Sequence, residues 1–72
     1  MNRRWNRVTK QYGENLTVDA FLADIVEVCR RHRLSLAHED REGAFIVEPL
    51  CPENIDWVFH AFDNVGVTCT SA

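Results

Sequence analysis

The sequence predicts a small α+β fold in which two helices pack on one face of an antiparallel β-hairpin. Three observations predict it: a long amphipathic segment at residues 17–33, two short apolar runs around a polar turn at 34–48, and a helical segment that begins with a proline at residue 52. Elements of this kind bury their apolar faces in two packed layers. We therefore expect the order α-β-β-α in a domain of residues 17–72, with a candidate C-terminal strand, behind a basic N-terminal arm of residues 1–16.

The segment from Thr17 to Arg33 has the strongest helical pattern. Thr17 is the expected N-cap, because its hydroxyl can accept hydrogen bonds from the free backbone N–H groups of the first turn. Three arginines near the end suit the negative pole of the helix dipole. Apolar side chains recur at helical spacing and form one face that must be buried. These side chains are Val18, Phe21, Leu22, Ile25, Val26, Val28 and Cys29.

The runs LSLAH (34–38) and AFIVE (44–48) are separated by EDREG, which ends in a glycine. Such an arrangement predicts a β-hairpin in which Gly43 takes a positive φ. The second run is apolar on both faces, so we expect its strand to be the more central one. Pro49 cannot donate a ladder hydrogen bond and should end that strand.

A second helix should begin at Pro52, which suits the first helical turn. Its apolar residues repeat at helical spacing and predict a narrow core stripe of Ile55, Val58, Phe59 and Phe62. Gly66 is the expected residue just past the helix. The β-branched tail VTCT, residues 67–70, is the candidate C-terminal strand.

Composition limits the function classes. A chain of 72 residues makes one domain, and none of its apolar runs is long enough to span a membrane. Its three cysteines, residues 29, 51 and 69, lack the C-x-x-C spacing of zinc or redox sites. We therefore expect a cytoplasmic protein with free thiols, no cofactor and no disulfide framework.

The polar turn contains the most conspicuous cluster of ionisable side chains: His38, Glu39, Asp40 and Glu42. Calcium loops need ligands that alternate around a central glycine, and a zinc site would need further histidines from elsewhere. We expect a solvated acidic hairpin tip, with a metal-dependent enzyme at His38, Glu39 and Asp40 as a minor alternative. No serine, cysteine or lysine has a nearby base at a convincing spacing, which argues against catalysis.

Trp57 is the most informative single residue. On the second helix it should point away from the core stripe, in the company of His60. Two alternatives can cover its indole. Either the N-terminal arm folds back with Trp5 or Tyr12, or Trp57 belongs to an interface, where tryptophan is a favoured anchor.

Charge is divided along the chain. Residues 1–10 contain four cations and no acid, whereas residues 11–72 contain four arginines and eleven acids, for a balance of 4 − 11 = −7. The arm could neutralise phosphates and stack Trp5 on bases. The acidic body would repel the same nucleic acid, so an acidic protein surface, or the body of a second copy, is the better partner.

The stretch AHEDREGAFIVE, residues 37–48, is followed by NIDW at 54–57. This pattern resembles a group of short proteins encoded by bacteriophages, in which a helix rich in valine and isoleucine leads to SHEDGHGAFIVE and then to NIEW or NIDW. The likeness covers residues 18–62 and departs at Arg41 and Glu42, where the group has glycine and histidine. The resemblance implies a phage origin and a bacterial host cytoplasm, and it implies no mechanism.

These observations predict a small non-enzymatic protein-binding module, namely a phage-encoded modulator or inhibitor of a host defence or transcription protein. The alternative is a nucleic-acid-binding regulator that uses the N-terminal arm. The expected partner is a host protein, self-association is compatible with the pattern, and no membrane contact is expected. The predicted partner-binding residues are Arg3, Arg4, Trp5, Arg7, Lys10, Trp57 and His60.

Overall fold

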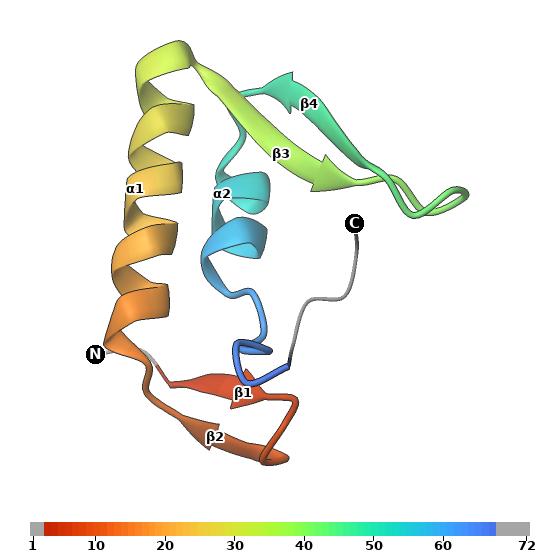
Figure 1. Ribbon diagram of the computed structural model, residues 1–72. Helices are drawn as coiled ribbons and strands as arrows, with labels where there is room; N and C mark the ends of the chain where they lie inside the picture. Colours follow the sequence, from red (N-terminus) through yellow and green to blue (C-terminus); the bar gives the residue numbers. More distant parts are fainter. Residues whose placement is uncertain (1–2, 68–72) are drawn as a thin grey trace.

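Two helices and two antiparallel hairpins make up the protein, in the order β1-β2-α1-β3-β4-α2 (Figure 1). The computed structural model describes residues 3–67. The predicted α+β class is confirmed. The two helices lie side by side, the β3–β4 hairpin extends from one end of this pair, and the β1–β2 hairpin lies at the other end. Apart from Val67, the candidate C-terminal strand lies outside the described residues.

Helix α1 spans Leu16–His32. Its N-cap is Asn15, whose side chain accepts a hydrogen bond from the backbone N–H of Val18 at 3.2 Å. The predicted cap, Thr17, is wrong, because the chain becomes helical at Leu16 and a residue inside the first turn cannot cap it. The helix ends where Arg33 adopts a left-handed conformation with φ 58°.

Strands β3 (Leu34–His38) and β4 (Phe45–Pro49) form the predicted hairpin, in which Leu36 lies opposite Val47. Gly43 has the expected positive φ of 73°. The predicted central position of the second strand is wrong, since β4 pairs only with β3 among the described residues. Without a further strand, the apolar side chains of β4 stay exposed.

Helix α2 spans Pro52–Phe59 and begins at the predicted proline. It stops earlier than expected, with His60 as its C-cap. Phe62 therefore lies beyond the helix and is 64% exposed, so its predicted place in the core stripe is wrong. Val58 does enter the core as expected.

A hydrogen-bonded polar triad around the buried Ser35 attaches α2 to the β3–β4 hairpin. Ser35 is fully buried, and its hydroxyl donates to the Pro49 carbonyl oxygen at 2.8 Å. The Asn54 amide of α2 donates to the Ser35 hydroxyl at 3.0 Å and to the Glu48 carboxylate at 2.9 Å. Buried polar groups stabilise a fold only when they are hydrogen-bonded, and these bonds meet that requirement.

The β1–β2 hairpin was not expected from the sequence. Strands β1 (Arg4–Asn6) and β2 (Gln11–Gly13) pair antiparallel, with Trp5 opposite Tyr12. Two backbone hydrogen bonds of 2.8 Å tie the hairpin to Asp63, one accepted by its carbonyl oxygen and one donated by its N–H. The basic segment is thus docked on the loop that follows α2.

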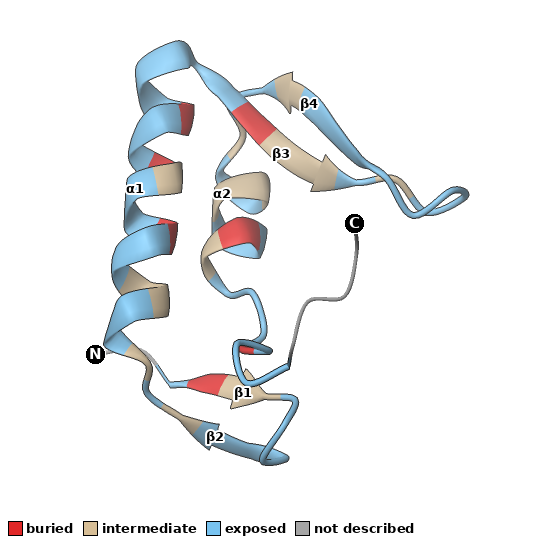
Figure 2. Cartoon of the chain, in the orientation of Figure 1, coloured by how far each residue is buried: buried red, intermediate tan, exposed pale blue. Residues whose placement is uncertain are grey.

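The hydrophobic core is small. Within residues 3–67 only Leu22, Val26, Cys29 and Val58 are buried apolar side chains, and they lie where α1 faces α2 (Figure 2). Fourteen large apolar side chains of the same part are exposed. Within these residues, neither helix has the length and apolar character required to cross a membrane.

Candidate protein-binding site

The largest group of exposed aromatic side chains lines an open groove of about 720 Å³ between the β3–β4 hairpin, α2 and the loop after α2. We call it the Trp57 groove. Its floor is apolar and its rim is polar. The floor consists of Leu22, Leu36, Phe45, Trp57, Val58, Ala61 and Phe62, and the rim of Arg7, Asp56, His60 and Asn64.

Helix α2 positions the indole of this groove. Val58 is turned into the core, so the preceding residue, Trp57, lies about 100° away on the side of the hairpin. Trp57 is 50% exposed, and its nearest aromatic neighbour is the His38 ring at 6.3 Å between centroids. The aromatic residues of the N-terminal segment do not line the groove; Trp5 and Tyr12 contact each other edge to face at 5.2 Å.

Two phenylalanines enlarge the groove, and the sequence analysis missed both. Phe45 on β4 is 67% exposed and Phe62 is 64% exposed. The sequence pattern favours an interior position for each. For Phe45 one signal was available. Strand β4 is apolar on both faces, and a hairpin without a third strand leaves part of that apolar surface uncovered.

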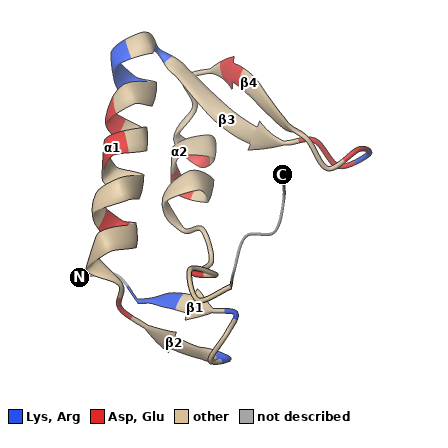
Figure 3. Ribbon diagram, viewed as in Figure 1, with Lys and Arg blue, Asp and Glu red and all other residues tan. Residues whose placement is uncertain are grey.

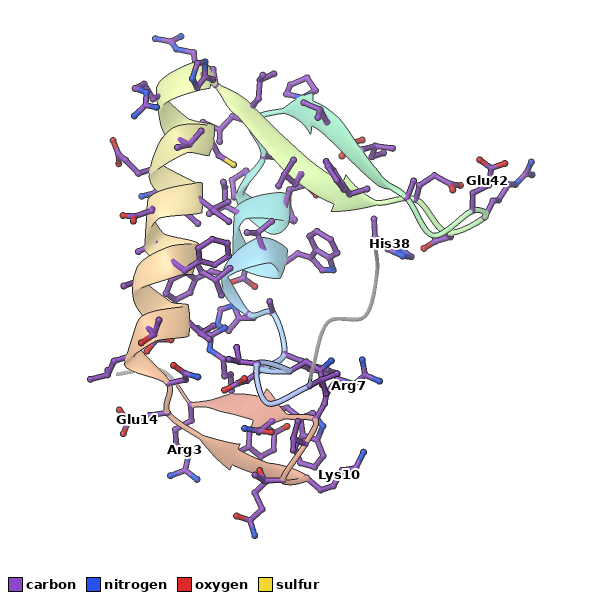
Figure 4. All side chains as sticks on the ribbon, viewed as in Figure 1. Arg3, Arg7, Lys10, Glu14, His38 and Glu42 are labelled. Atoms are coloured by element: carbon purple, nitrogen blue, oxygen red, sulfur yellow. The ribbon has the colours of Figure 1, made fainter. Side chains whose placement is uncertain are left out.

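The rim of the Trp57 groove carries both signs of charge. On one side the His60 ring lies 2.8 Å from the Asp56 carbonyl oxygen and 3.2 Å from its carboxylate. On the other side is the exposed Arg7, at the end of the molecule opposite the hairpin that carries His38 (Figure 4). An apolar centre with a mixed polar rim is the usual anatomy of a protein–protein interface.

Arg4 has a structural role. Its side chain is 4% exposed and pairs with the Asp19 carboxylate at 2.5 Å. The same guanidinium donates to the carbonyl oxygens of Phe59 and Ala61 at 3.0 and 2.8 Å, and it lies over the Phe59 ring at 5.7 Å. Because these internal partners occupy Arg4, we leave it out of the binding surface.

The other cations of the N-terminal segment lie around the β1–β2 hairpin and give this end of the molecule a basic surface (Figures 3 and 4). Arg3 is exposed and donates to the Tyr12 carbonyl oxygen at 3.2 Å. Lys10 lies in the turn with φ 59°. Of the predicted partner-binding residues, the fold brings Arg7, Trp57 and His60 together in one groove and leaves Arg3, Trp5 and Lys10 at the basic end.

The acidic side chains of the hairpin tip do not line the Trp57 groove, and Figure 3 shows the acidic segment at the far end of the β3–β4 hairpin. Glu39 accepts hydrogen bonds from the backbone N–H groups of Glu42 and Arg41, at 2.6 and 2.8 Å, and these bonds lower the pKa of its carboxyl group. Asp40 lies 3.1 Å from the His38 ring, and Glu42 projects from the tip (Figure 4). Glu39 therefore stabilises the turn, and no three His, Cys, Asp or Glu side chains of residues 3–67 converge as metal ligands do.

Among the open apolar surfaces of residues 3–67, the Trp57 groove is the one that gathers Phe45, Trp57 and Phe62. Comparison of the chain with protein-family models, curated proteins and solved structures finds no match.

Proposed function

We propose that the chain is a non-enzymatic protein-binding module that uses the Trp57 groove to dock on a host protein. The observation that carries the proposal is the half-exposed Trp57 at the centre of an apolar groove, between Phe45 and Phe62. Tryptophan is enriched among the residues that dominate binding energy, and such residues lie in desolvated centres of interfaces. The groove would accept apolar side chains that project from a helix or loop of the partner.

The biological setting of this proposal comes from the resemblance of residues 18–62 to bacteriophage-encoded proteins. We propose that the chain is phage-encoded, acts in the bacterial cytoplasm, and modulates or inhibits a host protein of defence or transcription. A small binding module of this kind would act most directly by occupying a surface that its target needs. The mixed rim of Arg7, Asp56 and His60 would set the orientation of the bound partner.

Affinity capture from a bacterial host lysate, followed by mass spectrometry and titration of the captured protein, tests this proposal. Trp57→Ala should weaken the affinity for the captured protein about thirtyfold, which corresponds to the roughly 2 kcal/mol expected of a central anchor. Leu16→Ala is the matched control, because Leu16 is 68% exposed and lies outside the groove. Equal capture by both variants would count against the Trp57 groove as the binding site.

A second candidate function rests on the basic end. Arg3, Arg7 and Lys10 are exposed around the β1–β2 hairpin, and Tyr12 on β2 is 62% exposed. Cations beside an exposed aromatic ring are typical of surfaces that bind single-stranded nucleic acid. In this alternative, the chain is a nucleic-acid-binding regulator that uses its N-terminal segment.

Three point substitutions test this alternative better than a truncation does. Deletion of residues 1–10 would also remove Arg4 and its internal hydrogen bonds. The variant with serine at positions 3, 7 and 10 keeps Arg4 and should bind single-stranded oligonucleotides less tightly. Its log–log salt slope should also be smaller by about 0.7 for each phosphate that is no longer neutralised. An unchanged slope would exclude the basic end as the nucleic-acid site.

A further inference from the structure

Another open apolar surface lies between α1 and the β3–β4 hairpin and shares Leu36 with the Trp57 groove. We call it the Phe21 groove. Its volume is about 500 Å³, and side chains from three elements line it. The apolar members are Phe21, Ile25, Val28, Cys29, Leu34, Leu36 and Val47.

The Phe21 groove is too exposed to be explained as part of the core. Phe21 is 61% exposed, Val28 45%, Leu34 44% and Val47 58%. Neighbouring apolar side chains that the fold itself leaves open are a common feature of interaction sites.

The charges beside this surface indicate what covers it. Asp24 and Arg31 are seven residues apart on α1, which is about two turns, so both lie on the same flank of the stripe formed by Phe21 and Val28. Both are exposed, and within residues 3–67 neither forms an ion pair. Asp24 precedes Arg31 along the helix, and Figure 3 shows the acidic residues of α1 before its basic end.

We infer that the Phe21 groove binds the same groove of a second copy, with the two α1 helices antiparallel about a two-fold axis near residue 28. In this arrangement residue i of one helix faces residue 55 − i of the other. Asp24 of each copy therefore faces Arg31 of the other copy, which gives two ion pairs. Phe21 then lies opposite the C-terminal end of the second α1, and Val28 lies next to the axis. A two-fold contact requires a surface that is complementary to itself. The flank of α1 that carries Asp24 and Arg31 meets this requirement, because it presents one acid and one base.

The antiparallel direction has two further supports. It sets the positive end of each helix dipole beside the negative end of the other. It also leaves the Trp57 groove open, because the two grooves share only Leu36 among their lining residues. The dimer is therefore compatible with the proposed docking on a host protein and does not depend on it.

Charge reversal of the full chain provides the experiment, with dimer affinity measured by sedimentation equilibrium. Asp24→Arg alone creates two Arg–Arg contacts and Arg31→Asp alone creates two Asp–Asp contacts, so each should raise the dissociation constant about tenfold or more. The double variant D24R/R31D restores both pairs and should recover the affinity. An equimolar mixture of the two single variants should form a one-to-one heterodimer that is tighter than either homodimer.

Two further variants locate the contact. Val28→Glu should give a monomer, because it buries two carboxylates at the axis, and Trp57→Ala should leave the dimer intact. A wild-type chain that stays monomeric up to about 1 mM would overturn the inference, as would single reversals that dimerise like the wild type or a mixture that forms no heterodimer. Circular dichroism of each variant separates a failure to dimerise from a failure to fold, since Asp24 and Arg31 are both exposed.

Discussion

Arg4 joins β1, the first turn of α1 and the end of α2. Its guanidinium is held by one carboxylate and two carbonyl oxygens, and its Nε is buried without a hydrogen-bond partner. Removal of one member of a buried ion pair leaves the other charge uncompensated. Arg4 therefore matters more to folding than its place in a basic segment indicates.

We predict that Arg4→Ala lowers the free energy of unfolding by about 3 kcal/mol. Arg4→Lys should lower it by less, because an ammonium group keeps the charge but cannot reach all three oxygen partners. Urea denaturation measures both. Arg3→Ala is the matched control and should stay within about 0.5 kcal/mol of the wild type, since Arg3 is exposed. Equal losses for positions 3 and 4 would contradict the assigned role.

Asp63 links the loop after α2 to both ends of the N-terminal segment. The Val65 N–H and the Asn15 amide donate to its carboxylate, each at 3.0 Å, and lower its pKa from the ordinary value of 3.8. The folded state therefore binds this proton less readily than the unfolded state does. The stability that results is present above the ordinary pKa and is lost as the pH falls through the lower pKa of the folded state.

The expected measurement is a series of urea midpoints between pH 7 and pH 3. The wild type should lose stability at the acidic end, and Asp63→Asn should show a shallower loss from a lower starting stability at pH 7. The lower stability at pH 7 is expected because the new side-chain NH2 of residue 63 would face the Asn15 NH2, and two donors cannot hydrogen-bond to each other. If the urea midpoints of the two proteins fall in parallel as the pH decreases, other carboxyl groups cause most of the loss of stability.

Among the elements, the β3–β4 hairpin depends most clearly on a single backbone conformation. Gly43 has φ 73°, which residues with a Cβ rarely adopt, and Gly13 has no such constraint and has open space where a Cβ would lie. Gly43→Ala should therefore cost about 1 kcal/mol, while Gly13→Ala should stay within about 0.5 kcal/mol of the wild type. Urea midpoints of the two variants make the comparison. A Gly13→Ala loss as large as that of Gly43→Ala would contradict it.

The sequence predicted the elements that have regular patterns. Helix α1, both strands of the second hairpin and the start of α2 at Pro52 follow from periodicity and turn chemistry. The β1–β2 hairpin could not be predicted, because each strand has three residues and its stability comes from Arg4 and Asp63, whose partners are distant along the chain. The early end of α2 was missed because nothing local marks Phe59 as its last residue.

The candidate site was only partly predictable for a related reason. Trp57 could be assigned to a surface from the helical period alone. Phe45 and Phe62 look like core residues in the sequence, and only the folded shape leaves them uncovered. The Phe21 groove was hidden in the same way, since an apolar helix face is normally read as the interior.

For the molecule as a whole, the small core and the exposed grooves predict that stability depends on concentration. If the Phe21 groove is buried between two copies, unfolding is coupled to dissociation, and the urea midpoint should rise as the protein concentration increases. Val28→Glu should unfold at a lower midpoint that does not change with concentration. Circular dichroism at two concentrations about a hundredfold apart is sufficient to see this. A wild-type midpoint that does not change over that interval would argue against a coupled dimer.

The bridge between Asn6 and Asp63 also bears on how the protein is made. A ribosome synthesises the N-terminal segment first, yet that segment has no docking site until the loop after α2 has been translated. Helix α1 and the β3–β4 hairpin can form from neighbouring residues, whereas closure of the chain spans nearly its whole length and is slow for that reason. The nascent protein therefore passes through an open stage, at which chaperones and proteases of the cell can still reach its uncovered aromatic side chains.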